Sequence, residues 1–132
     1  MEERVDRQVG AQVTITKDFS EADLALFMLV MGDAALTADE PLSPDRQQRQ
    51  AAPGALLVAL LASTAARHAL RPQYARFVSA ATQVLEPAYT DDTLTTTAEL
   101  AALDGETMRV IAHCKNQDGR RLAEGEFLLS DS

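Results

Sequence analysis

Two stretches of sequence decide the predicted fold: Phe19-Ser-Glu-Ala-Asp-Leu-Ala-Leu-Phe-Met-Leu-Val-Met-Gly-Asp33 and Ala51-Ala-Pro-Gly-Ala-Leu-Leu-Val-Ala-Leu-Leu61. The second stretch predicts a helix from Gly54 to about Leu70. Its apolar residues run nearly all round the helix, which is typical of a helix buried inside a domain. A buried helix needs a sheet or other helices to cover it, so the rest of the chain must supply that cover.

The first stretch predicts a shorter helix that follows Ser20. The Ser20 hydroxyl can accept a hydrogen bond from the backbone N–H of Asp23, and acidic residues near the start of a helix favour the positive end of its dipole. Gly32 is a typical left-handed stop. Four apolar residues fall on one face at helical spacing: Leu24, Phe27, Met28 and Met31.

The remaining segments predict β-strands, because β-branched and apolar residues alternate with polar ones and turn signals separate them. The expected strands are Val13–Thr16, Phe77–Leu85, Thr93–Leu103, Met108–Lys115 and Arg121–Leu129. Asp104-Gly105 predicts a tight hairpin. The sequence therefore predicts one α+β domain over residues 1–132, with an antiparallel sheet wrapped around a long central apolar helix. Residues 1–10 and 130–132 are expected to be frayed.

Composition excludes several classes of function. A formal net charge of −8 argues against nucleic-acid binding, since phosphate contacts need clustered Lys and Arg. The single cysteine, Cys114, cannot form an internal disulfide, which fits the reducing cytoplasm. The longest apolar run, residues 54–62, is far shorter than the roughly 20 residues of a membrane span. We therefore expect a cytoplasmic protein that contacts neither nucleic acid nor membrane.

The order and spacing of these segments resemble the MaoC-like, or (R)-specific enoyl-CoA hydratase, branch of the hot-dog fold over about residues 13–129. That family reads Gly-Asp-x-Asn-Pro-x-His after its first helix, where this chain reads Gly32-Asp-Ala-Ala-Leu-Thr-Ala38. The carboxylate is kept as Asp33, while Ala38 stands at the position of the histidine. Pro87-Ala-Tyr-Thr-Asp-Asp-Thr-Leu94 is similar to the family's Pro-Val-x-x-Gly-Asp-x-Leu turn, with Asp91 where the family has Gly.

The resemblance implies a site for an acyl thioester of CoA or of a carrier protein, with no cofactor. The sequence also has no Cys/His cluster that would predict a metal site. It places Asp33 at the catalytic carboxylate and Pro53, Gly54 and Ala55 at the substrate-binding turn. There a backbone N–H polarises the thioester carbonyl at the start of the central helix. Because Pro53 has no N–H, the donor must be Gly54 or Ala55. The alternative interpretation of Asp33 is a residue that simply ends a helix.

Three functions stay open. The first is a hydratase or dehydratase-type lyase with a modified site, and the second is a hot-dog thioesterase in which Asp33 activates water. The third is a non-catalytic subunit that binds an acyl thioester or supports a partner. Loss of the motif histidine at Ala38 favours a changed or lost reaction, because the family uses a carboxylate and a histidine on one water molecule. We expect a homodimer or a dimer of dimers, with Phe77–Leu85 as the pairing edge by resemblance.

The other reactive side chains predict no second site. His68 lies roughly 20 Å along the helix from Gly54, which within one protomer is too far for it to share a water with Asp33. His113 falls on the polar face of its strand. Both are interpreted as surface or interface histidines, and Cys114 as a small buried apolar residue.

Overall fold

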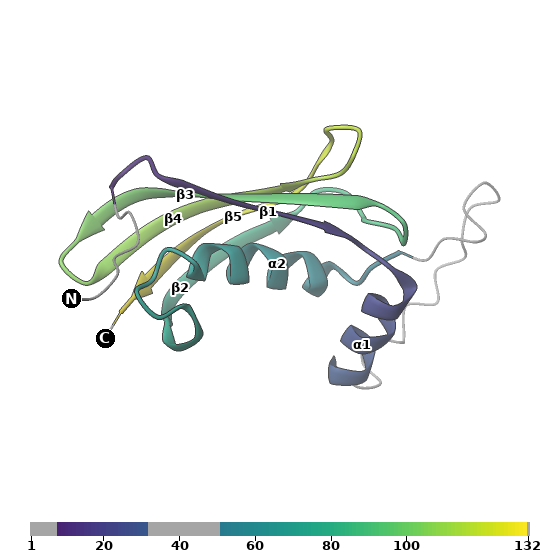
Figure 1. Cartoon of the computed structure of the whole chain (residues 1–132), viewed down its shortest axis with the longest axis horizontal. Helices are drawn as coiled ribbons and strands as arrows, with labels where there is room; N and C mark the ends of the chain where they lie inside the picture. Colours follow the sequence, from purple (N-terminus) through teal and green to yellow (C-terminus); the bar gives the residue numbers. More distant parts are fainter. Residues whose placement is uncertain (1–7, 32–50, 132) are drawn as a thin grey trace.

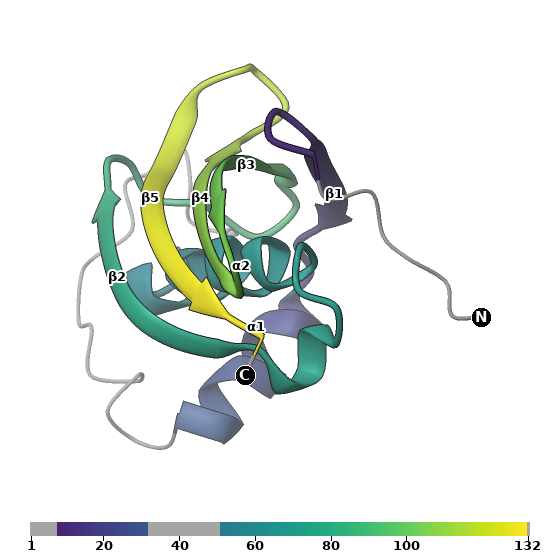
Figure 2. The ribbon, with the colours of Figure 1, turned by 90° about the vertical axis from the view of Figure 1, so that its left-hand side faces the viewer.

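The structure is a computed structural model that describes residues 8–31 and 51–131. Within them, a curved five-stranded antiparallel sheet wraps around one long helix, as the sequence predicts (Figures 1 and 2). The elements are β1 (Gln12–Asp18), α1 (Glu21–Met31), α2 (Gly54–Ala66), the short 3₁₀ helix η3 (Pro72–Tyr74), β2 (Arg76–Val84), β3 (Thr93–Asp104), β4 (Thr107–Lys115) and β5 (Arg121–Ser130). The strand order is β1-β3-β4-β5-β2.

The centre of the sheet is the meander β3-β4-β5. The predicted hairpin at Asp104-Gly105 is confirmed: Asp104 pairs with Thr107, and Gly105 has a positive φ of 64° that suits glycine. The predicted alternation is also confirmed, since every second side chain is buried from Leu94 to Leu100 in β3 and from Met108 to Cys114 in β4. These buried residues are Leu94, Thr96, Ala98, Leu100, Met108, Val110, Ala112 and Cys114.

The two outer strands pair with the meander from opposite sides. β1 pairs with β3, and β2 pairs with β5, so β2 and β3 lie far apart in the sheet although they are neighbours in the chain. All nine residues of β2 are exposed, and the strand contains a register shift between Phe77 and Ser79. Among the described strands, β2 therefore lies at the edge of the sheet and pairs only with β5.

The core lies between α2 and the inner face of the sheet. Leu57, Leu61 and Ala65 of α2 are fully buried there, whereas Leu56 and Leu60 are only partly buried. The helix thus covers the sheet with one face and leaves another partly open. It also ends at Ala66, earlier than predicted, because the chain continues in single turns in which His68 N–H donates to the carbonyl of Ala65 and Ala69 N–H to that of Ala66.

Helix α1 begins with the predicted cap. The Asp23 N–H donates to Ser20 Oγ over 3.1 Å, and the Ser20 N–H donates to Asp23 Oδ2 over 3.0 Å. Each side chain therefore accepts a hydrogen bond from the backbone N–H of the other residue. Leu24 is buried in the core. The helix projects from one end of the molecule (Figure 1) and exposes three apolar side chains: Leu26, Leu29 and Val30. Its predicted stop at Gly32 lies outside the described residues.

Three described residues near the chain ends make hydrogen bonds or strand pairs where fraying was expected. Ser130 is the last residue of β5 and is buried, and the Asp131 N–H donates to the Glu106 carbonyl. At the other end, the Gly10 N–H donates to the Leu100 carbonyl over 2.8 Å. The predicted fraying is therefore wrong for Gly10, Ser130 and Asp131, because hydrogen bonds to neighbouring strands hold these residues.

Candidate functional site

The start of α2 offers backbone donors at the predicted substrate-binding turn. Pro53 precedes the helix with extended backbone angles (φ −57°, ψ 143°), and no side chain of the described residues caps it. The first N–H groups of an α-helix have no acceptor within the helix. In α2 these N–H groups belong to Gly54 and Ala55, and both residues are exposed. This end of α2 can therefore donate to a carbonyl oxygen or stabilise negative charge on it.

Two backbone contacts fix this helix start against the segment before β3. Ala51 forms an isolated antiparallel bridge with Tyr89, and the Ala52 N–H donates to the Ala88 carbonyl over 2.8 Å. Ala52 and Ala88 are both buried. The position of Gly54 is thus set by the turn at residues 86–92, far away in the sequence.

That turn is built around Asp92, which is almost fully buried. Its carboxylate accepts hydrogen bonds from the Tyr89 N–H over 2.8 Å and from Gln117 Nε2 over 3.0 Å. Asp91 beside it has a φ of 77°, a left-handed conformation that glycine adopts most easily. In the family that the sequence resembles, glycine stands at this position of the turn. The left-handed backbone of Asp91 is therefore the conformation expected from the motif.

The same turn also holds the start of α1. The Phe19 N–H donates to the Asp92 carbonyl over 2.8 Å, and the Asp91 N–H donates to the Phe19 carbonyl over 2.7 Å. Phe19 is buried and lies directly before the cap residue Ser20. One turn therefore fixes the starts of both helices. Sequence reasoning found the turn motif but not the role of Asp92 and Gln117 as its internal hydrogen-bonding pair.

Val84, at the end of β2, lies beside Gly54. A β-carbon built on Gly54 would stand 3.4 Å from Val84 Cγ2, which is ordinary van der Waals contact. Val84 pairs with Ala123, and its side chain is partly exposed. Sequence reasoning did not single out Val84, because only the pairing of β2 with β5 brings it to the start of α2.

The predicted catalytic carboxylate, Asp33, lies outside the described residues, as does Ala38. Met31 is the last described residue before them. Of the four predicted site residues, the structure thus brings Pro53, Gly54 and Ala55 together at one helix start. The role of Asp33 stays a prediction.

The histidines and the cysteine lie elsewhere. His68 is buried, with its Nε2 2.9 Å from the carbonyl oxygen of Ala98, so its interpretation as a surface histidine is wrong. His113 is half-buried on the outer face of the sheet. Burial lowers its pKa, and the cationic Arg121 and Lys115 lower it further. Cys114 is buried as predicted, and burial raises the pKa of its thiol, which disfavours the reactive thiolate.

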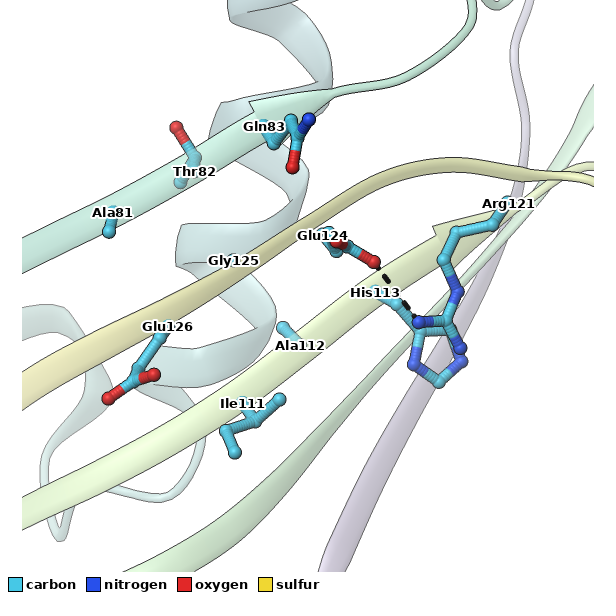
Figure 3. Close-up of a pocket in the computed structure, with 10 residues that line it drawn as sticks. All are labelled: Ala81, Thr82, Gln83, Ile111, Ala112, His113, Arg121, Glu124, Gly125 and Glu126. Carbon is cyan, nitrogen blue, oxygen red and sulfur yellow. Dashed lines mark hydrogen bonds and ion pairs between the residues drawn. The ribbon is translucent and has the colours of Figure 1, made fainter.

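A hollow of about 440 Å³ lies on the outer face of the sheet, the face opposite α2 (Figure 3). His113, Arg121 and Glu124 line it together with Gln83 and Ile111. Arg121 Nη1 donates to Glu124 Oε1 over 3.2 Å. Glu126 also lines the hollow and pairs with Arg109. Both acids of the hollow are therefore already paired with an arginine.

Two further properties concern the described ranges, 8–31 and 51–131. No helix in them is both long and apolar enough to cross a membrane. They also contain no group of three or more His, Cys, Asp or Glu side chains arranged to hold a metal ion.

Solved structures of hydratases share this fold. The R-hydratase PhaJ1 from Pseudomonas aeruginosa superimposes with a TM-score of 0.76 at 24% identity, covering 93% of this chain and 81% of that one. The (R)-hydratase from A. caviae involved in PHA biosynthesis gives 0.74 at 20% identity, covering 95% and 97%.

A thioesterase shares it as well. A hypothetical thioesterase from Streptococcus pneumoniae TIGR4, solved with coenzyme A, gives a TM-score of 0.66 at 15% identity and covers 96% of this chain and 83% of that one. No protein-family model matches the sequence, and no curated protein matches it either. The chain therefore has the hot-dog fold, in the form also found in R-hydratases of the MaoC-like type.

Proposed function

We propose that this protein binds an acyl thioester of CoA or of a carrier protein and acts on it as a hydratase or dehydratase-type lyase with a modified site. The observation that carries the proposal is the start of α2, where Gly54 and Ala55 present backbone donors that no described side chain caps. The solved hot-dog structures of hydratases and of a thioesterase with coenzyme A support it.

The proposed chemistry follows from these donors and one carboxylate. A thioester carbonyl accepts a hydrogen bond from the N–H of Gly54 or Ala55, which favours negative charge on that oxygen. In hydration, the water oxygen bonds to C3 of an enoyl thioester while Asp33 takes a proton from that water. The resulting enolate then takes a proton at C2 from the carboxylic acid that Asp33 has become or from solvent water, and Asp33 returns to its carboxylate form. Ala38 can neither accept nor donate a proton, so Asp33 has no partner from the motif, and we expect weak or no hydration of crotonyl-CoA.

Thioester hydrolysis is the second candidate. The hypothetical thioesterase with coenzyme A has the same fold, and hydrolysis needs only one base to activate water. In this reaction Asp33 takes a proton from water, the water oxygen bonds to the carbonyl carbon, and the carbon–sulfur bond breaks to release the thiol. The non-catalytic alternative keeps the binding step alone, as an acyl-thioester-binding or scaffold subunit.

The first experiment removes the carboxylate. Asp33→Asn should abolish whatever turnover of crotonyl-CoA or butyryl-CoA exists. It should change the free energy of unfolding by less than about 1 kcal/mol, because Asn tolerates the same backbone conformations at a helix end. Unchanged turnover in this variant would exclude Asp33 from the chemistry.

The second experiment removes the donors one at a time. Gly54→Pro deletes one N–H at the first helical position, where proline is well tolerated, and Gly54→Ala adds the same β-carbon but keeps the N–H. The difference between the two variants therefore reports the hydrogen bond itself, and Ala55→Pro tests the neighbouring donor.

Removing the working donor should weaken ground-state binding by about 2- to 12-fold, the value of one hydrogen bond, and any turnover by about 100- to 1,000-fold. Gly54→Val should block binding sterically, since its branched side chain would fill the space in which the thioester carbonyl approaches the backbone. If neither proline variant nor Gly54→Val alters binding of butyryl-CoA in calorimetry, the site is not at the start of α2.

We also propose that two copies pair through β2. This strand is at the edge of the sheet, all nine of its residues are exposed, and Phe77, Val78 and Val84 are large and apolar. Unpaired strand edges of this kind favour pairing with another chain. Sedimentation at micromolar concentration should give a dimer or a dimer of dimers, and a 14.3 kDa monomer would contradict the proposal.

A further inference from the structure

Val84 stands on the same side of the sheet as α2. It pairs with Ala123, whose side chain is fully buried on that side, and residues opposite each other in antiparallel strands share a face. Three carbon atoms of its isopropyl group lie within 4 Å of the position that a β-carbon on Gly54 would occupy, the nearest at 3.4 Å. About 43% of Val84 is exposed, so its isopropyl group can contact a molecule bound at the start of α2.

The chain directly after Val84 is firmly held. The N–H groups of Leu85 and Glu86 both donate to the Leu122 carbonyl, over 2.8 and 3.2 Å. The Glu86 carboxylate also receives two hydrogen bonds from Arg120, from Nε at 2.8 Å and from Nη2 at 2.9 Å. Such bidentate pairs have a defined geometry. The isopropyl group therefore forms a fixed apolar wall next to the backbone donors.

From this geometry we propose that Val84 is a specificity-determining residue that limits the bulk of the acyl group next to the thioester carbonyl. A carbonyl oxygen that accepts from the Gly54 N–H brings its carbon and the adjacent α-carbon close to that residue, and Val84 occupies the space beside Gly54. An unbranched acyl chain fits beside the wall, whereas a methyl branch on the α-carbon collides with it. This inference rests on the proposed function, because it requires an acyl thioester bound at Gly54 or Ala55.

The test compares two CoA esters that differ only in this branch, butyryl-CoA and isobutyryl-CoA. Calorimetry gives the dissociation constant of each with the full chain. Val84→Ala should lower the dissociation constant of isobutyryl-CoA relative to that of butyryl-CoA by at least 10-fold, because the smaller side chain leaves room for the methyl branch. Val84→Ile should shift the ratio the opposite way. Val78→Ala is the matched control, since Val78 is a similarly exposed valine at the bulge near the other end of β2.

The outcomes separate this inference from the proposed function. If both esters bind and Gly54→Pro or Ala55→Pro weakens them, but neither Val84 variant changes the ratio, the role of Val84 is wrong and the binding site stands. A ratio that changes equally in Val78→Ala also contradicts the role of Val84. If neither ester binds to wild-type protein, the proposed function and this inference are both refuted.

Discussion

Among the glycines that the structure describes, Gly125 is the one at which an added β-carbon meets the shortest contacts. It lies on β5 opposite Ala112 on one side and Thr82 on the other. A β-carbon here would stand 2.9 Å from Thr82 Cγ2, 3.2 Å from the backbone oxygen of Ala81 and 3.3 Å from Phe127 Cε2. The backbone oxygen belongs to a paired strand and cannot move aside, so Gly125→Ala must displace β2 from β5.

The magnitude combines two opposing effects. Overpacking of this kind costs about 1–3 kcal/mol, and replacing a strand glycine by alanine returns about 0.5–1 kcal/mol of backbone entropy. We therefore expect Gly125→Ala to lower the free energy of unfolding by about 1–2 kcal/mol. For a chain of this size that corresponds to a fall in Tm of roughly 4–8 °C. Urea denaturation and a thermal melt measure the two quantities.

Two variants test the cause. In the double variant with Thr82→Ala, the nearest clashing atom is gone, so part of the lost stability should return as a favourable coupling between the two sites. Gly54→Ala is the glycine control, since its β-carbon meets nothing closer than 3.4 Å and stability should not fall. Wild-type stability of Gly125→Ala, or a loss that Thr82→Ala does not reduce, would refute the packing argument.

Three further predictions concern the turn, the helix cap and the cysteine. Asp91 has a left-handed φ of 77°, which glycine adopts easily and a β-branched residue does not. Asp91→Gly should therefore keep or raise the free energy of unfolding, and Asp91→Val should lower it by about 1–2 kcal/mol. Equal urea midpoints for the two variants would contradict this. A hydrogen bond from the Ser20 backbone N–H is the main cause that holds the pKa of Asp23 below its usual value of 3.8. The ionised Asp23 carboxylate therefore stabilises α1 fully above pH 3.8, and this stabilisation is lost as the pH falls through the lowered pKa. An NMR titration should show a pKa below 3.8. Ser20→Ala keeps the backbone N–H but removes the hydroxyl, which also donates to Asp23 Oδ2 over 2.9 Å, so it should raise this pKa only in part and cost about 1 kcal/mol of helix stability. Cys114 should react with a thiol reagent only as fast as the protein unfolds, and fast labelling of the native protein would show that the strand opens locally.

The fold could be predicted because it depends on periodicity, which sequence displays directly. Alternation from Leu94 to Leu100 and from Met108 to Cys114 marked the two central strands, and the apolar run after Gly54 marked the covering helix. The cap at Ser20 could also be predicted, because both partners lie within four residues of each other. The strand order could not be predicted from chain order, since β2 pairs with β5 rather than with β3.

The contacts that could not be predicted join residues distant in the sequence. His68 follows the end of α2 as a polar residue, and nothing in the sequence indicates that the Ala98 carbonyl would accept its ring N–H. The contacts of Val84 with Gly54 and of Asp92 with Gln117 likewise depend on the register of other strands. At the proposed site, sequence reasoning identified the backbone donors, and only the structure identified the side chain that stands beside them.

The strand order also determines when each part of the chain can fold. The hairpins β3-β4 and β4-β5 join strands that are close in the sequence; for example, Asp104 pairs with Thr107. β1 pairs only with β3, which is far from it in the sequence; for example, Val13 pairs with Ala98. Distant pairings form slowly because a long loop must close first. During synthesis, β1 leaves the ribosome well before β3 exists, and its alternating side chains have no strand to pair with. The meander should therefore fold first and recruit β1 last, so amides in β1 should become protected from hydrogen exchange after those of β4.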